Sequence, residues 1–183
     1  RYSSLPEVEP DAVIAVCDTK EQGGDYVVMP IAYQYGPDFY IEAVICDNGS
    51  PKVVEPRLAS ALVEHRVQLA RFESNQAGGR VAEKVQDMVK ELGGRAKLST
   101  KYTTANKETK VLVNSPWVIK NCLFKGDSVY KSDREYKRFM QFVTGYTLGG
   151  KNKYDDTVDA LAMLAEYIQS FALNKVEIVK RPF

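Results

Sequence analysis

The sequence is poor in the residues that nitrogen- and sulfur-rich metal sites require. Among 183 residues there is a single histidine, His65, and the three cysteines, Cys17, Cys46 and Cys122, lie far apart in the chain. No Cys-x-x-Cys pair or zinc spacing occurs, which excludes zinc-finger, zinc-protease and disulfide-framework patterns. The shortage of histidine also disfavours a hydrolase with a catalytic triad. A metal ion bound here would therefore depend mainly on carboxylates, which favours magnesium or manganese over zinc or copper.

Long apolar segments and phosphate-binding loops are lacking as well. Apolar runs such as Ala160 to Ala165 fall far short of the roughly 20 residues that cross a bilayer, so no membrane association is expected. No charged-then-apolar leader opens the chain, and Cys17 and Cys46 lie in apolar runs typical of buried, reduced cytosolic thiols. The pattern G-x-x-x-x-G-K-[ST] is absent, so we expect no ATP hydrolysis. The first residue, Arg1, suggests a domain of a longer protein.

Acidic and basic residues are separated along the chain. The net charge is only +1, but residues 1–94 hold nine Lys and Arg against fifteen Asp and Glu. Residues 95–153 reverse this balance, with thirteen basic against four acidic residues, and residues 154–183 hold three against five. An acidic body with one basic stretch favours a polyanionic partner, although a solvated lysine-rich face explains the charge pattern equally well.

Length and composition fit one globular domain. With 44% hydrophobic and 27% charged residues, the chain can bury a core without disulfides or metal. Residues 1–11 are expected to form a linker, residues 12–172 one folded domain and residues 173–183 a tail. Runs rich in Val, Ile and Tyr predict strands at 12–17, 25–35, 39–46, 67–72 and 96–103. Apolar spacing predicts helices at 58–66, 78–92, 106–113, 133–143 and 155–172, with Pro51 and Pro56 in a loop and Pro116 opening a separate segment.

The order of these elements predicts an α/β fold. Three consecutive strands without intervening helices indicate an antiparallel meander. The fourth strand is reached through a helix and should therefore lie parallel to the first. We expect a mixed sheet covered by helices.

Carboxylates stand at the ends of several of these elements. Asp18 follows the first strand and Glu73 follows the fourth, so both are expected at one edge of the sheet, where α/β folds bind ligands. Asp155, Asp156 and Asp159 begin the final helix, and the last two share one of its faces. Clustered carboxylates raise one another's pKa values, and a fold tolerates them when divalent cations neutralise them. Two such cations can clamp the attacking and leaving oxygens of a phosphoryl displacement.

Each of these acids also has an ordinary structural interpretation. Aspartate at a strand end is a common turn former, and Asp155-Asp156 at a helix start is a common cap. Glu73 could pair with Arg71 or Arg80. Asp159 is harder to explain in this way, because it is expected to face inward among alanines, where an unpaired carboxylate is costly. The residues alone leave both interpretations open.

Four stretches of the sequence occur in a fixed order. They are Asp18 with Gly23-Gly24-Asp25-Tyr26, Glu73-Ser74-Asn75 with Gly78-Gly79, Asn106-Lys107-Glu108-Thr109-Lys110 and Asp155-Asp156-Thr157-Val158-Asp159-Ala160-Leu161-Ala162. In these stretches and their order, the chain from 12 to 172 is similar to the C-terminal nuclease domain of the large terminase subunit of tailed phages or prophages, which has a ribonuclease H-like fold. The last of the four stretches is the most specific. The resemblance implies a mixed five-stranded sheet flanked by helices, with strands 4 and 5 parallel to strand 1.

This resemblance implies an endonuclease that cuts concatemeric viral DNA during genome packaging. Two magnesium or manganese ions would serve the hydrolysis, with Asp18 bridging them and Glu73 and Asp156 completing the catalytic set. Asp155 and Asp159 are expected to be further metal ligands.

Three further positions, Asp25, Asn75 and Tyr154, belong to the resemblance. Asp25 and Asn75 are expected to support the metal ligands without binding metal themselves, and for Asp25 the role of a turn former is the alternative. Many relatives carry histidine where this chain has Tyr154, which leaves open which acid of the last helix is the principal ligand.

The resemblance also gives the basic stretch a partner. Duplex DNA is the expected ligand, held through phosphate contacts that do not read sequence. The implied protein partners are an upstream ATPase domain of the same polypeptide, the portal and the small terminase subunit, in the cytoplasm of an infected bacterium. The lysines expected to contact DNA are Lys97, Lys101, Lys107, Lys110, Lys151 and Lys153.

Three alternatives remain. Junction resolvases with a ribonuclease H-like fold also place a D-x-x-D-A motif on a last helix, but prefer four-way junctions and act as dimers. A non-catalytic module that clamps DNA or docks on the portal would bind without cleaving. A small-molecule phosphohydrolase is disfavoured, because the basic surface would be surplus for a small substrate.

Overall fold

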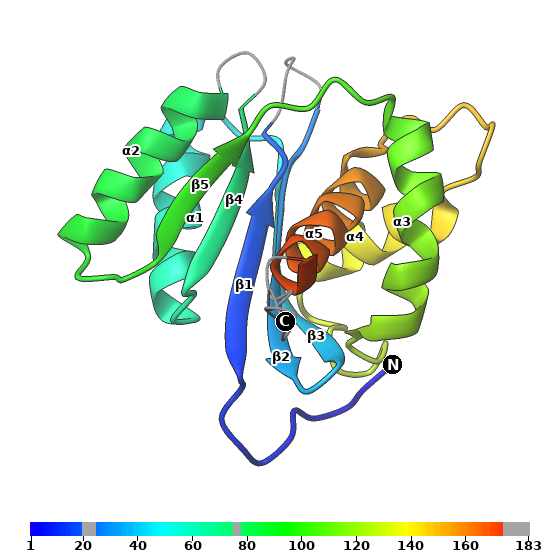
Figure 1. Cartoon of the computed structure of the whole chain (residues 1–183), viewed down its shortest axis with the longest axis horizontal. Coiled ribbons are helices and arrows are strands. Elements are labelled where there is room, and N and C mark those ends of the chain that lie inside the picture. Colours follow the sequence, from blue (N-terminus) through cyan, green and yellow to red (C-terminus); the bar gives the residue numbers. More distant parts are fainter. Residues whose placement is uncertain (20–24, 75–77, 174–183) are drawn as a thin grey trace, which may run out of the picture.

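A computed structural model describes residues 1–19, 25–74 and 78–173 (Figure 1). The turn at Gly23-Gly24, residue Asn75 and the tail from 174 lie outside the described residues. One six-stranded sheet has the strand order β5-β4-β1-β2-β3-β6. The strands are β1 (Ala12–Cys17), β2 (Val27–Tyr35), β3 (Asp38–Asp47), β4 (Leu69–Glu73), β5 (Lys97–Lys101) and β6 (Cys122–Phe124). The helices are α1 (Pro51–Glu64), α2 (Gly78–Glu91), α3 (Lys107–Asn121), α4 (Arg134–Gly145) and α5 (Asp156–Leu173).

The strand directions are those that the order of elements predicts. β1, β2 and β3 form an antiparallel meander, and β4 lies parallel to β1 with β5 parallel to β4. The prediction of five strands is wrong by one, because Cys122–Phe124 forms a sixth strand parallel to β3. Three residues are too few to show an alternating pattern, so this strand exists through its pairing with Phe39–Ile41.

Two helices are longer than the prolines in the sequence suggest. α1 begins at Pro51, in the first turn, where the missing N–H of proline costs nothing, and it continues through Pro56. α3 likewise runs unbroken through Pro116, so the prediction of a separate segment there is wrong. Next to this proline, Trp117 packs on Phe39 with ring centroids 5.3 Å apart. Packing against the sheet thus overrides the local cost of the proline.

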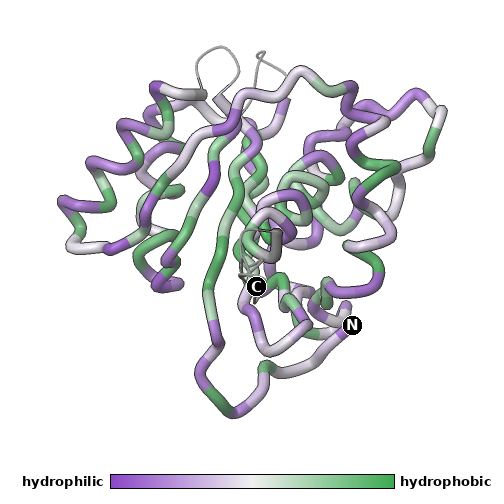
Figure 2. Tube along the Cα trace, in the orientation of Figure 1, coloured by the Kyte–Doolittle hydropathy of each residue, from purple (hydrophilic) through white to green (hydrophobic). Residues whose placement is uncertain are grey.

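The helices cover the two faces of the sheet. Figure 1 shows α1 and α2 on one side, and α3, α4 and α5 on the other. Along β1, Val13, Ala15 and Cys17 pack towards α1 and α2, whereas Ile14 and Val16 pack towards α4 and α5. The strand is therefore apolar on both faces, as its unbroken hydrophobic run predicts. Figure 2 shows that the central strands are mostly hydrophobic, whereas the outer helices carry both hydrophobic and hydrophilic residues.

Cys17 and Cys46 are buried free thiols, as predicted, and Cys122 is a buried free thiol as well. Burial is the main reason why the pKa of the Cys17 thiol lies well above its ordinary value, and the carboxylates of Asp18 and Glu73 raise it further. No helix among the described residues is long and apolar enough to cross a membrane.

Candidate metal centre

Strand geometry brings the first two acids together. Cys17 of β1 is in register with Phe72 of β4, so the residues that follow, Asp18 and Glu73, are neighbours at the carboxyl edge of the sheet. Side chains alternate along a strand, and Cys17 and Phe72 face α1 and α2. Asp18 and Glu73 therefore face the other side, where α5 lies.

Asp18 is held firmly at this edge. Its backbone N–H donates to the carbonyl of Val28 at 2.9 Å, and its carbonyl accepts from the N–H of Val28 at 3.0 Å. The side chain is buried, and its Oδ2 has no hydrogen-bond partner among the described residues. A buried carboxylate oxygen without a donor is costly, which indicates that a cation or another ligand completes it.

α5 supplies the third acid of the group, and this acid is Asp159. Oxygens of Asp18, Glu73 and Asp159, one from each, all lie within 4.8 Å of one another. Asp156 lies to the side, where its Oδ2 accepts from the N–H of Tyr26 at 3.2 Å. The sequence analysis expects Asp156 as the third catalytic acid and Asp159 as a further ligand, and among the described residues it is Asp159 that lies in the compact group with Asp18 and Glu73. Asp159 lies three residues further along α5, among small residues such as Ala160 and Ala162 that let the helix approach the sheet.

The other predicted supporting residues lie around this group. Asp155 immediately precedes α5 and is partly exposed. Asp25 is half-buried just before β2 and is not one of the three grouped acids. Tyr154 stacks on Phe142, with ring centroids 4.6 Å apart, and meets Tyr26 edge-on at 5.3 Å. This aromatic group fixes the entry to α5 and the backbone that binds Asp156.

Two lysines of α3 reach into the acidic group. Figure 1 shows the segment after β5 crossing the end of the sheet to α3, where Asn106 caps the helix by accepting from the N–H of Thr109. The Nζ of Lys107 lies 3.5 Å from Asp155, 3.2 Å from Asp156 and 4.0 Å from Asp159. The Nζ of Lys110 lies 2.5 Å from Oδ1 of Asp159.

The expectation that Lys110 contacts DNA is wrong. Its side chain is only 1% exposed, so it has no surface to offer a phosphate. The spacing of Lys107 and Lys110 repeats that of Asp156 and Asp159, three residues apart on facing helices. That match was present in the sequence as a signal for pairing between the two helices.

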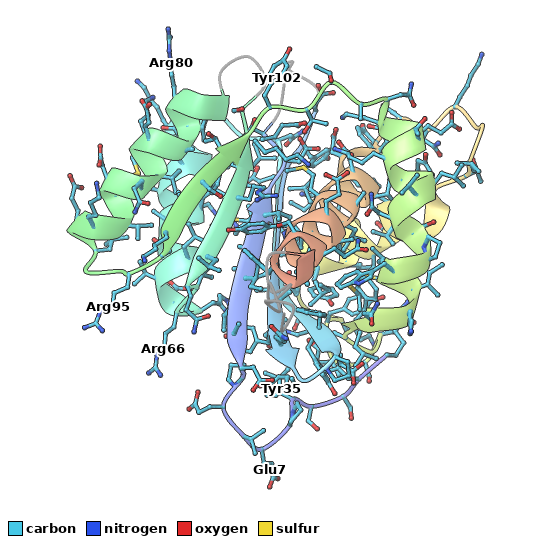
Figure 3. The ribbon with its side chains drawn as sticks, in the orientation of Figure 1. Glu7, Tyr35, Arg66, Arg80, Arg95 and Tyr102 are labelled. Atoms are coloured by element: carbon cyan, nitrogen blue, oxygen red, sulfur yellow. The ribbon has the colours of Figure 1, made fainter. Side chains whose placement is uncertain are left out.

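The remaining expected DNA contacts are more accessible. Lys101 pairs with Glu166 of α5, with Nζ 2.7 Å from Oε2. Lys97, Lys151 and Lys153 are exposed, and the ammonium of Lys153 lies 5.0 Å from the centre of the Tyr154 ring. Figure 3 shows Tyr102, next to Lys101, and Tyr35, the last residue of β2, at opposite ends of the sheet. The acids and Lys101 share the end marked by Tyr102.

Burial makes the charged forms of the acids unfavourable. For Asp18, burial and then the carboxylate of Asp159 raise the pKa well above its ordinary value, and Lys107 only partly opposes them. Burial raises the pKa of Asp159 to about 6, although Lys110 lowers it. Burial also raises the pKa of Asp156, against the lowering effect of Lys107.

Lys107 shows the opposite balance. Burial lowers its pKa, but the attraction of the surrounding acids, led by Asp18 and Asp156, outweighs burial and the net pKa is raised. Its ammonium therefore stays charged throughout the physiological range.

These shifts predict that the metal-free protein loses stability as the pH rises. The native state holds the Asp159 proton more tightly than the unfolded state, with a pKa of about 6 against 3.8. The stabilisation is complete below 3.8 and is lost as the pH rises through 6, by on the order of 2 to 3 kcal/mol. Urea unfolding in EDTA at several pH values between 4 and 8 would measure it.

Asp159→Asn is the matched comparison for this measurement, because it removes the titrating carboxyl. The comparison is needed because burial lowers the pKa of His65, which changes stability with pH in the opposite sense. The difference in unfolding free energy between the two proteins should change steadily from pH 4 to pH 7. A difference that is constant over this range would contradict the prediction.

Comparison with known proteins agrees with this architecture. No protein-family model and no curated protein matches the sequence. The Mn-soaked, inhibitor-bound terminase nuclease domain of human cytomegalovirus superposes with a TM-score of 0.61 at 13% identity, over 92% of this chain and 88% of that one. The chain has a ribonuclease H-like fold.

Two further structures share this ribonuclease H-like fold. The large terminase of a thermophilic bacteriophage superposes with a TM-score of 0.57 at 13% identity, over 92% of this chain and 42% of that one. The Holliday junction resolvase of fowlpox virus gives 0.55 at 12% identity, over 87% and 99% of the two chains. The expected resemblance to terminase nuclease domains is thereby confirmed at the level of the fold.

Proposed function

We propose that this chain is a metal-dependent endonuclease that hydrolyses phosphodiester bonds of duplex DNA. The observation that carries the proposal is the buried group of Asp18, Glu73 and Asp159, with an Asp18 oxygen left without a hydrogen-bond partner among the described residues. Oxygen-only ligand sets of this kind suit magnesium and manganese. The nuclease folds that this chain resembles support the same class of reaction.

The three acids would hold the cations. When bound, the ions lower the pKa of the attacking water and stabilise the leaving 3′ oxygen. The chain itself supplies position: the paired strands fix Asp18 and Glu73, and Lys110 fixes Asp159. Asp155 and Asp156, which pair with Lys107 beside the group, would be further ligands.

Exposed lysines would place the DNA. Lys151 and Lys153 are exposed in the loop that leads into α5, the helix that carries Asp156 and Asp159, and are suited to phosphate contacts. Lys97 and Lys101 lie on the edge strand β5. Because such contacts bind without reading base sequence, we expect cleavage with little sequence preference.

A role in viral genome packaging is the finer part of the proposal. It is supported by the ordered motifs and by the likeness to terminases, and it includes cutting of concatemeric DNA in the infected bacterial cytoplasm. An upstream ATPase domain, a portal and a small terminase subunit would be the partners. The match to only 42% of the thermophilic phage's large terminase is consistent with such a larger protein.

The test is cleavage of a supercoiled plasmid by the purified chain with Mn²⁺, with Mg²⁺ and with EDTA. We expect nicked and linear products only with metal. A four-way junction and a linear duplex of equal length should be cut at similar rates, whereas strong junction preference together with dimerisation would favour a resolvase. Duplex binding with neither cleavage nor metal binding by calorimetry would favour a clamping module instead.

A further inference from the structure

Lys107 occupies the outer side of the acidic group. Its ammonium lies within 4.0 Å of oxygens from three acids of α5 and the residue before it, Asp155, Asp156 and Asp159. One of these, Asp159, is also a member of the compact group with Asp18 and Glu73. A divalent cation bound at this group would therefore share carboxylate oxygens with the ammonium of Lys107.

The position of Lys107 is explained by the acids and not by its helix. It is the first residue of α3, where the helix dipole favours anions and disfavours a cation. Glu108, the next residue, is an anion and is therefore favoured in this first turn. The attraction of the carboxylates is what raises the pKa of Lys107 in spite of its burial.

Lys107 and Lys110 differ in their freedom to move. The side chain of Lys110 is 1% exposed, whereas that of Lys107 is 40% exposed and ends a flexible four-carbon stem. Lys110 is thus a fixed counter-ion of Asp159. Lys107 can leave its carboxylates without opening the core.

We propose that the ammonium of Lys107 occupies the outer cation position of this centre and competes with a divalent cation for Asp155, Asp156 and Asp159. The inference rests on the proposed function, since it assumes that the centre binds metal. In the metal-free protein Lys107 neutralises the cluster, and metal loading displaces it. A displaced ammonium remains at the rim of the centre, where it is available to a substrate phosphate, in keeping with the expected DNA contact at this residue.

The test compares Mn²⁺ binding by calorimetry for the wild-type chain and for Lys107→Met, which keeps the apolar stem but removes the charge. We expect Mn²⁺ to bind at least about tenfold more tightly to the variant, because like charges at these distances repel strongly even in water. In EDTA the melting temperature of Lys107→Met should fall, and added Mn²⁺ should raise it by more than in the wild type.

Two further variants make the result specific. Lys107→Gln removes the charge but keeps a hydrogen-bond donor for Asp156, so it gives the same test if the methionine variant folds poorly. Lys125→Met is the matched control: it removes the same charge from a pair with Glu42, 2.8 Å apart, that does not involve the acidic group. Its Mn²⁺ affinity should equal that of the wild type.

The possible outcomes separate this inference from the proposed function. Tighter binding by both Lys107 variants, or binding by them and not by the wild type, supports competition. Equal or weaker binding by the variants, with normal binding by the wild type, overturns the inference and leaves the nuclease proposal standing. Failure of every protein to bind Mn²⁺ overturns both.

Discussion

Replacing Asp18 by asparagine is expected to abolish metal-dependent DNA cleavage while making the metal-free protein more stable. The carboxylate is one of the three grouped acids, so its loss removes a proposed ligand, while asparagine keeps the shape of the side chain. Replacing a residue that hydrogen-bonds to a metal ligand typically costs about 10- to 100-fold in metal affinity or activity. The loss of a ligand itself should therefore cost at least about 100-fold in cleavage rate.

The gain in stability has a separate cause. Burial and the neighbouring carboxylates, Asp159 first among them, disfavour the charged form of Asp18. An amide removes that charge, so the free energy of unfolding in EDTA should rise by about 1 to 2 kcal/mol. Added Mn²⁺ should then stabilise the variant less than the wild type, because the ion has lost one of its ligands.

Plasmid cleavage and urea unfolding of the same protein samples would measure both effects. Asp87→Asn is a suitable control, because it makes the same change in charge on α2, at a side chain that is 70% exposed and pairs only with Lys90 among the described residues. It should cut like the wild type. Full cleavage by Asp18→Asn would show that the site is wrongly placed, and a loss of stability in EDTA would show that the carboxylate is satisfied in a way that the structure does not record.

The proximity of Asp18 and Glu73 could be predicted because it follows from strand geometry. Asp18 lies at the end of one buried strand, Glu73 at the end of a second, and a helical crossover between the strands makes them parallel, which places the two acids side by side. The alternation of side chains along β1 even decides which face they occupy. Successive side chains of a strand point to opposite faces, so the position of a residue along the strand determines its face.

The parts that were not predicted depend on contacts between distant elements. β6 has three residues and exists through its pairing with β3, and α3 passes through Pro116 because of its packing on the sheet. Which acid of α5 joins Asp18 and Glu73 depends on how closely the helix packs against β1 and β2. The spacing of acids along a helix predicts that they share a face. It does not predict how closely that face approaches the sheet.

Replacing Lys110 by methionine is expected to be the most destabilising single change in the centre. The side chains of Lys110 and Asp159 are each 1% exposed, and neither oxygen of Asp159 accepts a hydrogen bond from the described residues beyond this ion pair. Breaking a buried pair from one side leaves an uncompensated charge, which typically costs about 3 to 5 kcal/mol. Urea unfolding in EDTA at pH 7.5 would measure the loss.

The second substitution, Asp159→Asn, decides whether the charge is the cause. The double variant removes both charges, so it should unfold with a free energy closer to that of the wild type than Lys110→Met alone, and the double-mutant cycle should give a coupling well above 1 kcal/mol. If the double variant is as unstable as the single one, the loss comes from the packing of the lysine stem and not from the stranded carboxylate. Mn²⁺ offers an independent check: a divalent cation at the acids would neutralise Asp159 in place of Lys110, so the ion should restore more stability to Lys110→Met than to the double variant. That result would tie the buried lysine to the metal centre as the residue that keeps Asp159 in place while the site is empty.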